Sequence, residues 1–194
     1  MLKGFNLLHR ISLSLKAIHA LAIYANSDVM FDSALHFLEK GLENNEVIVL
    51  LSYSFNETAL ATMRHLYARN CLQAKQSPEF VDLGDFAGLY FTGTQEKAHK
   101  ERLLCSWAEL MNEAVRLRKG LRVFVDLHEL FNHNFAEELI KWESVVNSAV
   151  QSYGESVFAL QIMKGCLESD VVRLGLESFR VLQQCHNCIY VIPG

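Results

Sequence analysis

ALAIY at residues 20–24 and VIVLL at residues 47–51 are short apolar runs on either side of a helical pattern at residues 28–44. Neither run alternates polar and apolar residues, which is typical of strands covered on both faces in a parallel sheet. Between them, apolar residues recur at helical spacing and form one stripe: Phe31, Ala34, Leu35, Leu38 and Leu42. The stretch therefore predicts a strand, a helix and a second strand, the unit from which parallel α/β sheets are built.

The same order of strand and helix continues along the chain. Further apolar runs that predict strands lie at residues 80–83, 121–125, 157–163 and 189–192. Helical patterns fill the intervals, at residues 54–70, 94–118, 134–149 and 169–184. Ile11-Ser-Leu-Ser-Leu15 alternates instead, and we expect an exposed edge strand there. The sequence thus predicts an α/β fold with a doubly wound, mostly parallel sheet of about six core strands and helices on both faces.

Composition fits one globular domain over residues 1–194, with residues 1–18 as an N-terminal extension. Hydrophobic residues make up 51% of the 194 and charged residues 21%, enough for a well-buried core. The net charge of −4 gives no attraction for nucleic acid or an anionic membrane. Uncharged runs near the N-terminus span about five residues, too few for a secretory signal or a membrane span. We therefore expect a cytoplasmic protein.

The junction Tyr24-Ala-Asn-Ser-Asp-Val-Met-Phe-Asp-Ser33 is where nucleotide-binding α/β domains hold phosphates. Such a loop needs glycines for close backbone approach and usually a lysine for the β- and γ-phosphates. No glycine, lysine or arginine lies between Ala25 and Lys40, and Asp28 and Asp32 would repel a triphosphate. We expect no working nucleotide triphosphatase site.

The run from Phe37 to Leu50 reads as a helix closed by a turn and followed by a core strand. It resembles the circadian-clock ATPase KaiC and its RecA-like relatives, in which a similar run follows the phosphate loop. Aligned on that resemblance, Val29, Met30 and Phe31 occupy the places of the loop's last glycine, its lysine and its metal-binding hydroxyl residue. All three of those functions are lost.

A closer resemblance, covering His19 to Ile192, is to the MEDS (methanogen/methylotroph DcmR sensory) domain, a degenerate branch of that superfamily. It is carried by the order and spacing of six motifs: His19-Ala-Leu-Ala-Ile-Tyr24, Gly41-Leu-Glu43, Tyr90 to Gly93, Gly120-Leu-Arg-Val-Phe-Val-Asp126, Trp142-Glu143 and Val157-Phe-Ala-Leu-Gln-Ile162. Where the family often has an aromatic pair, this sequence has Leu127-His128-Glu129, so we expect a different ligand. The resemblance implies a RecA-like fold and sensing of a small molecule or hydrocarbon derivative. It also implies signalling to a histidine kinase or transcription regulator, without catalysis or a cofactor.

Asp126-Leu-His-Glu-Leu-Phe-Asn-His133 is the densest polar cluster at any predicted strand end. Open α/β sheets bind ligands outside the carboxyl ends of their strands. We therefore expect any ligand pocket near five residues: Tyr24, Ser52, Asp82, Asp126 and His128.

Two alternatives to a sensor stay open. The first is an enzyme with a metal on Asp126, His128, Glu129 and His133, since imidazole and carboxylate suit zinc or iron, although this spacing matches no specific metal motif. The second is a protein-interaction module with a filled pocket. A homo-oligomer is compatible with the sensor and with both alternatives. We favour a sensor that binds no metal.

Cys185-His-Asn-Cys188 is a lone C-x-x-C among five cysteines, and Ile189 excludes haem attachment. A redox-active pair wants a cysteine at a helix N-terminus. These two instead follow the end of the last predicted helix, so we expect inert, reduced thiols. His19, at the start of the first strand, is explained by a capping or strand-end hydrogen bond.

Overall fold

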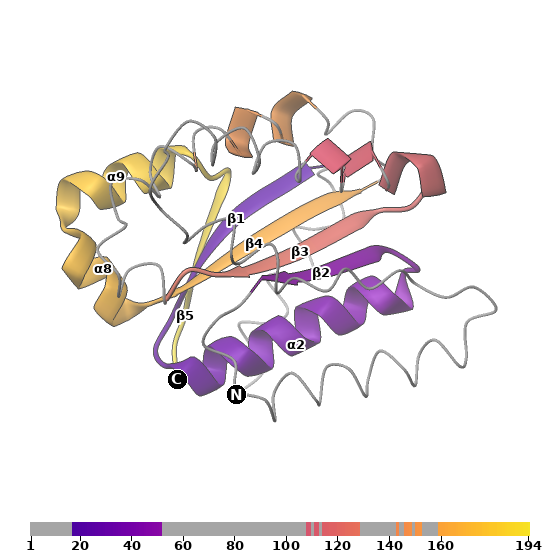
Figure 1. Cartoon of the computed structure of the whole chain (residues 1–194). Coiled ribbons are helices and arrows are strands. Elements are labelled where there is room, and N and C mark those ends of the chain that lie inside the picture. The colour runs from indigo at the N-terminus through magenta and orange to yellow at the C-terminus, as the bar shows by residue number, and fades with distance from the viewer. Residues whose placement is uncertain are drawn as a thin grey trace, which may run out of the picture.

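The computed structural model describes residues 17–51, 108–109, 111–112, 114–128, 143, 146–148, 150–152 and 159–194. In these residues five strands form one open sheet, in which every pairing is parallel. They are β1 (Ala17–Tyr24), β2 (Val47–Leu51), β3 (Leu121–Asp126), β4 (Leu160–Leu167) and β5 (Cys188–Ile192). Their order across the sheet is β2-β3-β4-β1-β5 (Figure 1). The predicted parallel α/β sheet is confirmed, and the predicted strands at 11–15 and 80–83 lie outside the described residues.

Helix α2 (Ser27–Glu43) follows β1 and begins at a polar cap. The side chain of Asn26 accepts a hydrogen bond from the backbone N–H of Val29 at 3.0 Å. Asp28 lies in the first turn and Lys40 in the last, where each charge complements the helix dipole. The helix thus starts and ends close to the range predicted from its apolar stripe.

The single helix predicted at 169–184 is wrong, because the structure has two helices there. These are α8 (Glu168–Leu174) and α9 (Leu176–Gln184), which are separated by Gly175. Gly175 has a φ of 77°, a left-handed conformation that glycine adopts at little cost and that ends α8. The apolar pattern runs through both helices and hides this break.

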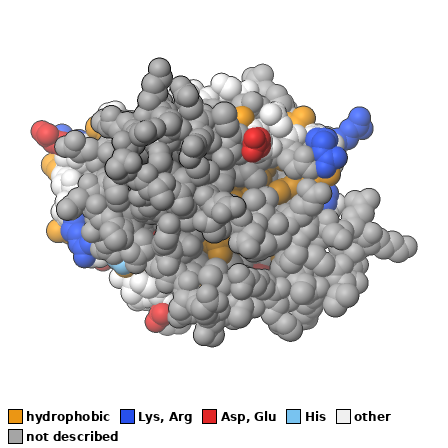
Figure 2. All heavy atoms as spheres, viewed as in Figure 1, with side chains coloured by type: hydrophobic (Ala, Val, Ile, Leu, Met, Phe, Trp, Pro, Cys, Tyr) orange, Lys and Arg blue, Asp and Glu red, His pale blue; other side chains and the backbone are white. Residues whose placement is uncertain are grey.

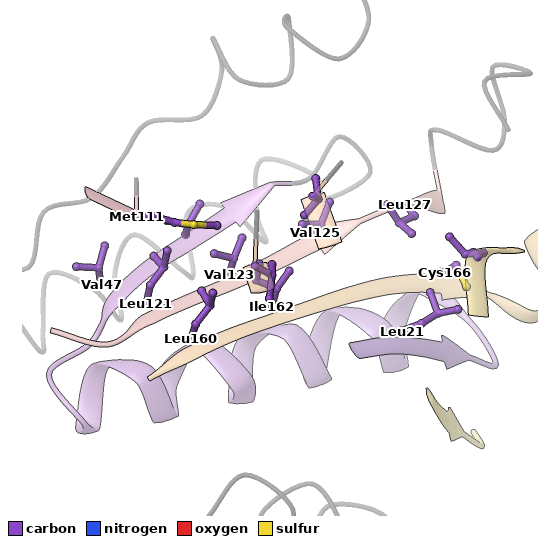
Figure 3. Packing of buried hydrophobic residues seen from close by; sticks show 14 of the residues in the cluster. Leu21, Val47, Met111, Leu121, Val123, Val125, Leu127, Leu160, Ile162 and Cys166 are labelled. Atoms are coloured by element: carbon purple, nitrogen blue, oxygen red, sulfur yellow. The ribbon is translucent and has the colours of Figure 1, made fainter. Parts of the chain in front are cut away.

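Helices cover both faces of the sheet, as predicted. On one face, α2 packs Met30, Ala34 and Leu38 against strand residues such as Phe124 and Met163. The opposite face carries a second apolar cluster. Figure 3 shows its strand side chains pointing away from α2: Val47, Leu121, Val123, Val125, Leu160 and Ile162. Helical residues within 108–117 and 143–152, together with α8 and α9, supply its outer layer: Met111, Ala114, Val146, Val150, Leu174 and Leu182.

The direction of the connections explains which helix lies on which face. The chain crosses from β1 to the far edge strand β2, and from there each later strand moves back across the sheet. Right-handed crossovers place helices on opposite faces when the direction reverses. Helix α2 therefore leaves β1 toward one face, while α8 leaves β4 toward the other. The neighbouring carboxyl ends of β1 and β4 form a topological switch point, where open α/β sheets bind ligands.

A buried ion pair ties the end of α2 to the sheet. The Arg122 Nε atom lies 2.6 Å from Glu46 Oε2, and its NH1 group donates to the Phe37 carbonyl at 3.0 Å. The same guanidinium lies over the Phe37 ring, 4.8 Å from the centroid. Pairing and hydrogen bonding together offset the cost of burying both charges.

Two properties of the described surface bear on function. No helix in the described ranges is long and apolar enough to cross a membrane. In Figure 2, the coloured acidic side chains lie apart from one another, while several basic ones lie close together at the upper right.

Candidate functional site

The carboxyl ends of β3 and β4 lie side by side and hold the first polar groups of the site. Asp126 is the last residue of β3 and pairs in register with Gly165 of β4. Its side chain is only 5% exposed, and Oδ1 accepts a hydrogen bond from the backbone N–H of His128 at 2.9 Å. Asp126 therefore fixes the turn that follows its own strand.

His128 contacts an acid from a distant part of the chain. Its Nδ1 atom lies 3.0 Å from both carboxylate oxygens of Asp170, a buried residue in the first turn of α8. Asp170 Oδ2 also accepts the backbone N–H of Leu167 at 2.7 Å, which fixes the acid in turn. Because an ionised carboxylate only accepts, Nδ1 carries the shared hydrogen. The His128 side chain is 18% exposed, and Nε2 makes no hydrogen bond within the described residues. Nε2 is thus the ring nitrogen available to a ligand.

Tyr24 ends β1 at the same edge, but its side chain lies in the core. It is fully buried among the residues under α2, and its hydroxyl donates to Met163 Sδ at 3.5 Å. Burial raises the pKa of this hydroxyl well above its usual value. Tyr24 therefore forms part of the floor beneath the edge rather than part of its surface.

The five predicted site residues have different outcomes. Asp126 and His128 are brought together, with Tyr24 two strands away on β1. Ser52 and Asp82 lie outside the described residues, as do Glu129 and His133 of the alternative metal site. Asp170 joins His128 although the sequence analysis did not select it. Its position just after β4, a strand whose carboxyl end meets this edge, was the signal that could have found it.

A second polar group, the interior cluster, comprises His19, Glu143, Lys164 and His186, all buried on the face opposite α2. Lys164 Nζ lies 2.6 Å from Glu143 Oε1 and 2.5 Å from Oε2. The Nε2 atoms of His19 and His186 lie 3.5 and 3.4 Å from that Oε2. The two imidazole centroids are 4.3 Å apart. The predicted strand-end hydrogen bond of His19 is also present, because its backbone N–H donates to the Asn187 side chain at 2.7 Å.

Burial and mutual attraction set the charges of the interior cluster. Burial raises the pKa of Glu143, but Lys164 and the two histidines outweigh it and bring that pKa down to about 2. Burial lowers the pKa of His186 to about 4 and also lowers the pKa of His19. At neutral pH the carboxylate is therefore ionised and both imidazoles are neutral.

Cys185 directly follows α9, as predicted, whereas Cys188 is the first residue of β5, and both are free thiols. Cys185 is the residue at the C-terminal end of α9, where the helix dipole disfavours a thiolate. Burial also raises the pKa of the Cys185 thiol. Cys185 therefore lacks the environment of an activated nucleophile.

The fold and its edge define an α/β domain whose sheet presents polar side chains, instead of a glycine-rich phosphate loop, at the switch point. The model of the MEDS family, described as MEthanogen/methylotroph, DcmR Sensory domain, matches residues 18–159. The chain therefore belongs to the MEDS family, a family of sensory domains, in agreement with the expected sensory role. Comparison with curated proteins gave no match. The matched range contains Asp126 and His128 and ends before Asp170.

Proposed function

We propose that this domain senses a small organic molecule, bound at the carboxyl edge of β1, β3 and β4. One observation carries the proposal. The buried Asp170 holds the His128 ring at 3.0 Å, the side chain is 18% exposed, and Nε2 makes no hydrogen bond within the described residues. A ring fixed in this way loses little freedom when it binds a ligand. Membership of a sensory family supports the same reading.

The chemistry of this edge favours a ligand with a hydroxyl or similar donor. In a neutral imidazole with its hydrogen on Nδ1, Nε2 is an acceptor. The neighbouring Leu127 and Leu167 are buried and apolar. A few fixed polar groups among apolar neighbours are typical of sites for small organic molecules. A hydroxylated hydrocarbon derivative fits this combination.

We further propose that the turn between β1 and α2 is a degenerate nucleotide-binding loop of RecA-like descent. The polar cap of α2 supports this proposal. Asn26 satisfies the N–H of Val29 at the helix start, where a phosphate loop would present free N–H groups to its ligand. We propose that ligand binding at the edge changes contacts of α8, the helix that carries Asp170, and that a histidine kinase or transcription regulator receives the signal.

Thermal melting of the full chain with a panel of short alcohols, aldehydes and halogenated hydrocarbons tests the proposal. A ligand at 100 times its dissociation constant adds about 2.7 kcal/mol to the free energy of unfolding. We expect one chemical class to raise the melting temperature of the wild type and of His36→Gln, a matched change at an exposed histidine of α2. The shift should be lost in His128→Gln. An equal shift in both variants would place the ligand elsewhere, and no shift with any compound would contradict small-molecule sensing at this edge.

A further inference from the structure

The interior cluster lies on the sheet face opposite α2 and takes no part in the proposed ligand edge. It brings together His19 from β1, the helical residue Glu143 and His186 from the turn before β5. His19 and Glu143 belong to two of the stretches that carry the family resemblance, His19–Tyr24 and Trp142-Glu143. The fold therefore joins three distant segments at one buried point.

A hydrogen bond of His186 determines which of its two ring nitrogens faces the Glu143 carboxylate. Its Nδ1 lies 2.7 Å from the Leu182 carbonyl oxygen, which only accepts, so Nδ1 carries the hydrogen. Nε2 is then the ring nitrogen that faces Glu143 Oε2, 3.4 Å away. These two atoms are therefore placed to share one cation.

The ring nitrogens of His19 also lack hydrogen-bond partners within the described residues. Both of its ring nitrogens, and Nε2 of His186, are buried without a hydrogen-bond partner in the described structure. A buried polar atom without a partner costs on the order of 1–3 kcal/mol. His19 Nε2 and His186 Nε2 both lie near one carboxylate oxygen of Glu143, and a cation bound among them would satisfy all three atoms.

The spacing of the ligand atoms suits a metal ion. Ligand atoms bound tetrahedrally at about 2.0–2.1 Å from zinc lie about 3.4 Å from one another. Glu143 Oε2 lies 3.5 Å from His19 Nε2 and 3.4 Å from His186 Nε2. One atom from each of the three residues lies within 4.8 Å of the other two.

We propose that His19 Nε2, His186 Nε2 and Glu143 Oε2 bind one divalent transition-metal ion, with zinc as the best fit. Two imidazoles and a carboxylate are a common zinc ligand set. The Leu182 carbonyl holds His186 in the tautomer that ligation needs, as backbone carbonyls commonly do for metal-bound histidines. The ion would join β1, the helix of Glu143 and the segment before β5, and the proposal stands independently of the ligand edge.

Lys164 is the competitor for this ion. Its Nζ contacts both carboxylate oxygens, and an ion on Oε2 leaves it only the 2.6 Å contact with Oε1. Two positive charges on one buried carboxylate repel each other strongly. In Lys164→Gln the amide still donates to Oε1 but the charge is gone. We expect this variant to bind zinc at least roughly tenfold more tightly than the wild type.

The experiment is a titration of the chelator-treated full chain with Zn²⁺, followed by calorimetry and melting temperature, and with Co²⁺, followed by visible absorption. We expect one ion per chain, a higher melting temperature and the absorption of tetrahedral Co²⁺. His19→Phe keeps an aromatic ring in the same buried place but offers no ligand atom, so it should fold and bind Zn²⁺ on the order of 100-fold more weakly. His36→Gln is the control for adventitious surface binding and should bind as the wild type does.

Three results would overturn the proposal. One is the absence of saturable Zn²⁺ binding in both the wild type and Lys164→Gln. Another is unchanged affinity in His19→Phe. The third is X-ray absorption of the Zn²⁺-loaded wild type that shows sulfur ligands, which would assign the ion to Cys185 or Cys188. Because this last measurement uses the wild type, it decides the question even if a variant fails to fold.

Discussion

Asp126 combines a structural contact with a position at the proposed ligand edge, and two substitutions separate these roles. Asn at this position still offers an oxygen to the His128 N–H, now 2.9 Å from Oδ1, whereas Ala offers none. We expect Asp126→Asn to keep the free energy of unfolding within about 1 kcal/mol of the wild type. Asp126→Ala should lose about 1–3 kcal/mol, because a buried N–H is left without a partner. Urea denaturation measures both values.

The ligand response of the same two variants tests function. If Asp126 lines the edge through its charge, Asp126→Asn abolishes ligand-induced stabilisation although the fold is intact. A fully stable Asp126→Asn that still responds to ligand would limit Asp126 to holding the turn before His128.

The sequence analysis selected candidate site residues where the deciding contacts are local in sequence. Asp126 and His128 were selected because they follow an apolar strand at a carboxyl edge. The pairing of His128 with Asp170 spans 42 positions, and that of His19 with Glu143 joins segments more than a hundred residues apart. Such pairs depend on which strands become neighbours, and strand order is not encoded in any local pattern.

Helix α2 approaches the sheet so closely at Gly41 that only a residue without a side chain fits at this position. A Cβ at Gly41 would lie 2.7 Å from Ile48 Cγ2 and 2.9 Å from Arg122 Cδ. Alanine improves helix propensity by up to about 1 kcal/mol. Overpacking against a fixed strand typically costs about 1–3 kcal/mol. Since Arg122 is also held by Glu46 and Phe37, overpacking should win. We expect Gly41→Ala to lower the free energy of unfolding by about 1–2 kcal/mol, measured in urea.

Gly175 provides a control for Gly41, because a side chain at Gly175 would destabilise the protein by backbone strain and not by close contact. A Cβ there meets nothing within 4 Å, but φ is 77°, so Gly175→Ala is strained only through the backbone. Asparagine tolerates this conformation better than alanine does. Gly175→Asn should therefore be milder than Gly175→Ala, while Gly41→Asn should be worse than Gly41→Ala. A stabilised Gly41→Ala would mean that α2 shifts away from the sheet at little cost.

Gly175 also shows why the helix predicted at 169–184 was wrong. Apolar periodicity continues across the break, with Leu174 and Leu182 both in the core. An isolated glycine within a helical pattern often remains helical, so its presence alone did not decide the matter. The positive φ follows from the different directions that α8 and α9 need in order to cover the same face, and that is tertiary information.

The parallel sheet was predictable from the apolar runs of the sequence. Apolar runs such as 121–125 became buried strands because a doubly covered sheet needs no polar face. What no run specified is that β1 lies between β4 and β5. That order creates the switch point beside the paired ends of β3 and β4, where Asp126, His128 and Asp170 meet.

The arrangement of the whole sheet also argues against ATP binding at the switch point. Met30, which occupies the place of a phosphate-loop lysine in the RecA-like resemblance, is fully buried under α2 and would lie 3.0 Å from a Cβ at Gly165. A lysine there would point into the core rather than toward phosphates. Asp28 and Asp32 are exposed on the first turns of α2, and the chain carries a net charge of −4. Both oppose a triphosphate.

We therefore expect no saturable heat when Mg-ATP is titrated into the full chain to millimolar concentration. The organic ligand found by thermal melting serves as the positive control in the same buffer, since it should give a saturable heat with the same protein. Asp28→Asn with Asp32→Asn removes the repulsion without restoring glycines or a lysine, and this double variant should also fail to bind. Weak binding gained by the double variant would show that charge alone excludes the nucleotide. A micromolar dissociation constant for the wild type would mean that the edge still holds phosphates by a route that needs neither a glycine loop nor a lysine at residue 30.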